Sequence, residues 1–165
     1  MQQYCYPGHV LTGCEFHEWN KLRFKLNSKL TWSEAEKACK GYDGKGTLVS
    51  IHDFIEDKKM DLLSEDESVW IGIRRSGETC DKPWHFVDNG QLLDSHSFTD
   101  WGFNEPNCGK LILGSTSDKR YSGDQHCVEI TKNLAKKNQW NDDNCDHRKA
   151  SLCFHPATEH YQERC

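Results

Sequence analysis

The alternation of apolar and polar residues predicts several short strands along the chain. In residues 4–30, apolar positions such as Leu22, Phe24 and Leu26 are typical of strands that turn back near Trp19-Asn20-Lys21. Five later strands are expected at residues 47–51, 69–73, 84–87, 127–131 and 151–154.

Helical spacing predicts two helices between these strands. The first is capped by Thr31 or Ser33 and ends near Gly41, because glycine favours helix C-termini. One face of this helix carries Trp32, Ala35 and Cys39. The second helix is expected to begin near Asp53. Its residues at helical spacing include Phe54, Lys58 and Leu62.

Little regular structure is expected between Asp88 and Cys127, where Gly, Asn, Pro and Ser are common. A loop of this length inside a compact domain is usually functional. Farther along, Leu134-Ala135-Lys136-Lys137 is a small basic cluster, which we interpret as an exposed turn.

Two short motifs offer hard oxygen ligands: Glu105-Pro106-Asn107 and Trp140-Asn141-Asp142. Calcium takes six to eight oxygens from carboxylates, carbonyls and amides, at about 2.3–2.6 Å. Two converging segments of this kind can hold an ion and leave coordination positions for a ligand rich in hydroxyls. The alternative is that Trp140 is a core residue and the two residues after it form a turn, which Asn and Asp favour.

Composition narrows the possible classes. A chain of 165 residues fits one domain, and its net charge of −5 argues against nucleic-acid binding. No apolar run reaches the length of a membrane span, so membrane insertion is not expected. Nine cysteines without a C-x-x-C pair indicate an oxidising, secretory environment.

The ordered motifs resemble those of a C-type lectin-like domain from Cys5 to Phe154. The matching segments are Thr31-Trp32-Ser33-Glu34-Ala35 before Cys39, Trp70-Ile71-Gly72-Ile73, Trp84-His85-Phe86-Val87-Asp88, the two oxygen-bearing motifs, and Cys127, Cys145 and Cys153. The resemblance implies an α+β fold with two helices flanking two small antiparallel sheets and a long ligand-binding loop. We therefore expect this domain at residues 1–155 and a polar C-terminal tail at 156–165.

The resemblance also implies the ligands of a calcium ion, with a cis bond before Pro106. The expected metal and sugar ligands are Glu105, Asn107, Asn141 and Asp142. In the family, the Glu-then-Asn order goes with mannose, fucose or N-acetylglucosamine. This chain has Gln125 where the family usually has a glutamate, and Asp124 is the alternative ligand if the loop shifts by one residue.

Three disulfides are implied by the resemblance: Cys5–Cys14, Cys39–Cys153 and Cys127–Cys145. In related domains, the positions of Cys80 and Cys108 lie near an auxiliary calcium site. We expect a Cys80–Cys108 disulfide to replace that ion, the alternative being that both are free or paired elsewhere. Cys165 then remains for an interchain bridge, which would make a covalent dimer.

The sequence thus predicts a secreted protein, or an extracellular domain of a membrane protein, that binds glycans or glycoproteins through calcium without catalysis. No nucleophile–base motif supports an enzyme. The alternative is a C-type lectin-like domain that binds a protein or another non-sugar ligand. The insertion at 108–126 could contact a ligand or partner, fold back as a hairpin, or face solvent.

Overall fold

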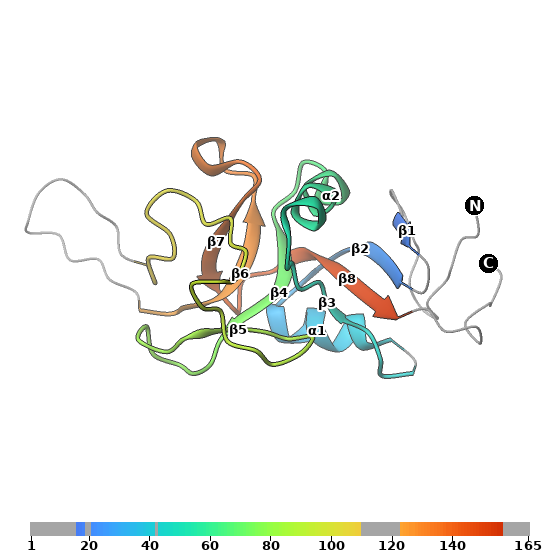
Figure 1. The fold of residues 1–165 in the computed structure, drawn as a ribbon, viewed down its shortest axis with the longest axis horizontal. Helices are drawn as coiled ribbons and strands as arrows, with labels where there is room; N and C mark the ends of the chain where they lie inside the picture. Colours follow the sequence, from blue (N-terminus) through green and yellow to red (C-terminus); the bar gives the residue numbers. More distant parts are fainter. Residues whose placement is uncertain (1–15, 19–20, 42, 110–122, 157–165) are drawn as a thin grey trace, which may run out of the picture.

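The computed structural model describes residues 16–18, 21–41, 43–109 and 123–156 of the chain. Its elements are, in order, β1 (Phe16–Glu18), β2 (Lys21–Leu30), α1 (Trp32–Lys40), β3 (Thr47–Leu48), α2 (Phe54–Ser64), β4 (Val69–Arg75), β5 (Trp84–Phe86), β6 (Gln125–Thr131), the 3₁₀ turn η1 (Leu134–Lys136), β7 (Gln139–Asn144) and β8 (Lys149–Pro156) (Figure 1). The last strand, β8, ends at Pro156, the first residue of the expected tail.

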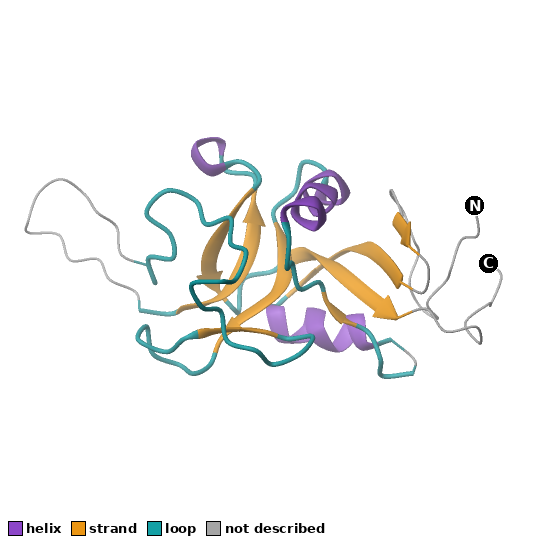
Figure 2. Ribbon diagram, in the orientation of Figure 1, coloured by secondary structure: helices purple, strands orange, loops and turns teal. Residues whose placement is uncertain are grey.

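The strands form two antiparallel groups that a short parallel contact joins into one sheet. The strand order is β1-β2-β8-β4-β6-β7, with β3 on β8 and β5 on β4. The joining contact pairs β4 with β8 in parallel, at Val69 with Ala150 and Trp70 with Ser151. This arrangement, with the two helices on either side of the strands (Figure 2), confirms the expected fold class.

Local signals set the helix ends as expected. The Thr31 hydroxyl accepts from the Glu34 N–H, and the Glu34 carboxylate accepts from the Thr31 N–H, which makes a reciprocal cap. Thr31 is therefore the cap, not Ser33. Gly41 ends α1 with a φ of 65°, a conformation that costs glycine little. Asp53 caps α2 by accepting from the Glu56 N–H at 2.7 Å.

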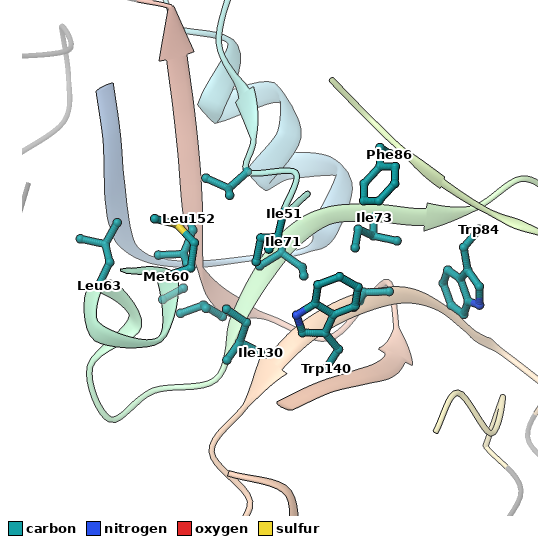
Figure 3. Close-up of a cluster of buried hydrophobic side chains, with 14 residues drawn as sticks. Ile51, Met60, Leu63, Ile71, Ile73, Trp84, Phe86, Ile130, Trp140 and Leu152 are labelled. Carbon is teal, nitrogen blue, oxygen red and sulfur yellow. The ribbon is translucent and has the colours of Figure 1, made fainter. Parts of the chain in front are cut away.

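Buried apolar side chains form two clusters on the two sides of the sheet. One lies against α1 and includes Trp32, whose indole N–H donates to the Ile71 carbonyl at 3.0 Å. In the other, shown in Figure 3, Trp140 lies among Ile71, Ile73 and Ile130. Trp140 is fully buried, so the strand that carries Asn141 and Asp142 is anchored in the core.

Three disulfides connect the described parts of the chain. Cys39–Cys153 ties α1 to β8, Cys127–Cys145 ties β6 to the residues after β7, and Cys80–Cys108 ties the loop after β4 to the long loop. These are the expected pairs among the described residues. The expected Cys5–Cys14 pair and the interchain role of Cys165 fall on residues outside them.

Candidate functional site

The loop that carries Glu105 is fixed along β7 (Figure 1). The Trp140 N–H donates to the Asp100 carbonyl at 2.7 Å, and the Gly102 N–H donates to the Trp140 carbonyl at 2.9 Å. The Trp101 ring packs edge-on against the Trp140 ring, with centroids 5.7 Å apart. The bond between Glu105 and the proline after it is cis, which confirms the expectation.

Asp142 joins the two oxygen-bearing motifs directly. Its Oδ1 accepts from the Asn107 N–H at 3.1 Å, and its Oδ2 accepts from the Cys108 N–H at 2.7 Å. The Asn107 side chain in turn donates to Glu105 Oε1 at 2.9 Å. Asp142 lies within strand β7 and is fully buried, so the two residues after Trp140 do not form the turn given as the alternative.

The electrostatics of the site arise from two buried carboxylates. The Glu105 side chain is 1% exposed. Burial and, after it, the neighbouring Asp142 carboxylate raise the pKa of Glu105 to about 7, although the Lys136 ammonium opposes this rise. Lys136 Nζ donates to Glu105 Oε1. Such a pair of carboxylates favours the uptake of a cation.

A second cation lies behind Asp142. The Arg75 guanidinium is 3.7 Å from Asp142 Oδ2 and stacks 4.1 Å above the Trp84 ring. It also donates to the carbonyls of Cys80 and Lys82, at 2.8 and 3.1 Å. Arg75 therefore connects the Cys80 side of the disulfide to the carboxylate that holds the long loop.

The candidate calcium ligands Gln125 and Asp124 have other hydrogen-bond environments. Gln125 begins β6, and its backbone carbonyl accepts from Arg75 at 3.4 Å. In the described part of the chain, its side-chain oxygen is buried and has no hydrogen-bond partner. Asp124 accepts instead from Asn144, at 2.7 Å.

Asn141 differs from Asp142 because successive side chains of a strand point to opposite faces. The Asn141 amide donates to Glu129 Oε1 at 3.0 Å. The structure thus brings together Glu105, Asn107 and Asp142, whereas the Asn141 side chain lies on Glu129.

The oxygens at the site fit a calcium ion in chemical type. The carboxylates of Glu105 and Asp142 and the Asn107 amide oxygen are hard ligands of the kind that calcium prefers. The Gln125 side-chain oxygen, at the start of β6, is of the same chemical type. Within residues 16–156, apart from the undescribed segments, no three acidic, imidazole or thiol groups meet in a metal cluster. A calcium ion at this site would therefore also need coordination by amide oxygens and by oxygens of a bound molecule.

Sequence reasoning missed the roles of Lys136 and Arg75. The sequence predicts an exposed turn around Lys136, but the Lys136 side chain is only 25% exposed and reaches Glu105. Neither role has a local sequence signal, because each cation meets its partner carboxylate across more than 30 residues of chain.

Comparison with known proteins decides the family. The family model described as the Lectin C-type domain matches residues 28–155. The chain belongs to the C-type lectin family. It is 31% identical over 140 residues to the C-type lectin BML-1 of Bungarus multicinctus, covering 81% of this chain and 77% of that protein. It is 33% identical over 128 residues to rat (Rattus norvegicus) L-selectin, covering 76% of this chain and 29% of L-selectin.

Solved structures of other proteins share the fold. The carbohydrate-recognition domain of cow CD23, determined in the presence of a GlcNAc2Man3 oligosaccharide, has a TM-score of 0.65 at 22% identity, covering 91% of this chain and 98% of that one. A Ca2+-dependent type II antifreeze protein in its Ca2+-free form has a TM-score of 0.59 at 19% identity, covering 85% and 95%. C-type lectin domains are generally non-catalytic and typically bind Ca2+.

Proposed function

We propose that this C-type lectin domain binds carbohydrate through a calcium ion held by Glu105, Asn107 and Asp142, without catalysis. The observation that carries the proposal is the direct bonding of Asp142 to the Asn107 and Cys108 N–H groups, which joins the two motifs. Gln125 supplies a further oxygen, and Asn141 joins the set by turning from Glu129.

Each of these side chains has a distinct role toward a sugar. A bound calcium ion supplies a positive centre for two neighbouring hydroxyl oxygens. The ionised Glu105 only accepts hydrogen bonds, whereas the Asn107 amide also donates them. Adjacent hydroxyls of mannose, fucose or N-acetylglucosamine would donate hydrogen bonds to Glu105 and accept them from Asn107. The oligosaccharide present with cow CD23 supports a ligand of this class.

The second candidate is a protein or other non-sugar ligand. The Lys136 ammonium on Glu105 favours it, because the site is already neutralised in part without an ion. In either case we place the domain outside the cell, as a secreted protein or as part of an ectodomain. None of the helices described here combines the length and hydrophobicity that a membrane span requires.

Retention on immobilised mannose, in calcium and then in chelator, tests the proposal. We expect retention in calcium and elution by chelator. The double variant Glu105→Gln with Asn107→Asp should lose mannose binding and gain galactose binding, because it exchanges acceptor and donor. Glu78→Gln is a matched control, because the Glu78 side chain is 80% exposed. Mannose binding by the double variant equal to that of the control would refute the assignment.

A further inference from the structure

We propose that Lys136 is the internal counter-cation of the candidate calcium site and that calcium binds by displacing its ammonium from Glu105. The inference rests on the proposed function, since it concerns the same site. Lys136 is the last residue of η1, between β6 and β7. Its Nζ donates to Glu105 Oε1, the same oxygen that accepts from the Asn107 amide.

The path of the Lys136 side chain is shaped by the fold. It lies across Gly102, where an added Cβ would be 2.9 Å from Lys136 Cδ and 3.2 Å from its Cβ and Cγ. Any larger residue at position 102 would therefore push the lysine away. The Gly102 carbonyl also accepts from the Glu105 N–H at 2.9 Å, so the lysine lies over the turn that positions its partner.

The turn that carries Lys136 is itself held in place. Asn133 caps it by accepting from the Ala135 N–H at 3.1 Å, and the Asn133 carbonyl accepts from the Lys136 N–H at 2.9 Å. The Lys132 ammonium donates to the Asn138 side chain across the same turn. The ammonium thus comes from a supported turn rather than from a loose surface chain.

Charge explains both why the lysine lies there and why calcium must move it. Glu105 and Asp142 are buried carboxylates, and such groups are costly without a cation beside them. A calcium ion bound to Glu105 would lie beside the Lys136 ammonium. Two cations that bind the same carboxylate repel each other strongly. Because a quarter of the Lys136 side chain is exposed, the ammonium has a way out to solvent.

The Lys136 ammonium therefore lowers the affinity of the site for calcium, and a substitution that removes its charge should raise that affinity. Lys136→Met keeps an unbranched chain over Gly102 and removes the charge. We expect it to lower the calcium dissociation constant about tenfold, at the low end of what close charge pairs contribute. Lys136→Arg keeps the charge and should stay near wild type. Lys137→Met removes an exposed neighbouring lysine and is the matched control.

Calorimetric titration of each intact variant with calcium chloride, after chelator treatment and dialysis, tests the displacement. Tighter binding by Lys136→Met alone supports it. Equal constants for Lys136→Met, Lys137→Met and wild type overturn it. If no variant binds calcium, the proposed function fails, and displacement fails with it.

Thermal unfolding of the ion-free protein tests the counter-cation separately. Lys136→Met should lower the melting temperature in the wild-type background and have little effect in a Glu105→Gln background. Equal losses in both backgrounds would show that Lys136 acts only through packing and would overturn the inference. Circular dichroism at room temperature confirms that each variant is folded before either measurement.

Discussion

The buried carboxylate of Asp57 should make the stability of the domain fall as pH rises. Asp57 lies on α2 and is fully buried. Its Oδ1 accepts from the Trp140 indole N–H at 3.0 Å, and its Oδ2 lies 3.6 Å from the Lys58 ammonium. Burial raises the pKa of Asp57 from its ordinary value of 3.8 to about 7, and the carboxylates of Asp61 and Asp100 add to the rise.

The sign follows from comparing the folded and unfolded states. The folded state holds a proton on Asp57 up to about pH 7, whereas the unfolded state loses it near 3.8. The resulting stabilisation is full below the unfolded pKa and is lost as pH rises through the folded one. The whole pKa difference corresponds to ~4 kcal/mol. Because burial also raises the pKa of the neighbouring Asp61, we expect ~1–2 kcal/mol from Asp57 itself.

Asp57→Asn tests this, because asparagine resembles the protonated acid and still accepts from Trp140. We expect the stability of the variant relative to wild type to rise by ~1–2 kcal/mol between pH 5 and pH 8. Urea unfolding followed by tryptophan fluorescence at both pH values measures the difference. Asp66→Asn, at an exposed position near the end of α2, is the control. A stability difference between Asp57→Asn and wild type that does not change with pH would refute the reasoning.

Two further predictions concern the supports of the site. Asp142→Ala should destabilise the ion-free domain by ~2–3 kcal/mol, because it leaves the Asn107 and Cys108 N–H groups without their acceptor, whereas Asn141→Ala should cost less than ~1 kcal/mol. Urea unfolding in chelator compares the two, and equal losses would contradict the structure. Replacing both Cys80 and Cys108 by serine should weaken calcium binding in calorimetry more than the exposed control Glu78→Gln does, since the bridge holds the residue next to Asn107.

The helix ends could be predicted from sequence because their signals are local. Thr31 with Glu34, Gly41 and Asp53 each act within one turn of the helix they bound. The strand at Trp140 cannot be predicted in this way, because it has no local signal. Its sequence, Gln139–Asn144, is polar apart from the tryptophan and shows no apolar alternation. Burial of Asp142 comes from the long loop packed over it, which no local pattern reveals.

The family resemblance predicted the Cys80–Cys108 pair, because it placed both residues near one auxiliary site. It could not predict what else fills that region. Arg75 lies in β4, a strand whose other residues are mostly apolar. Its guanidinium donates to backbone carbonyls and stacks on the Trp84 ring. A buried arginine of this kind depends on three segments that meet only in the folded chain.

The two cations of the site, Arg75 and Lys136, are held differently. One therefore supports the position of the long loop, and the other affects the affinity for calcium. Arg75 is 5% exposed, is bonded to the carbonyls of Cys80 and Lys82, and stacks on an indole, so we expect it to stay in place when an ion binds. The Lys136 ammonium is held by its ion pair with Glu105 and is partly exposed, so it can leave. A fixed charge beside Asp142 keeps the long loop docked in the ion-free state. We expect the movable charge on Glu105 to set how much calcium is needed to complete the proposed site.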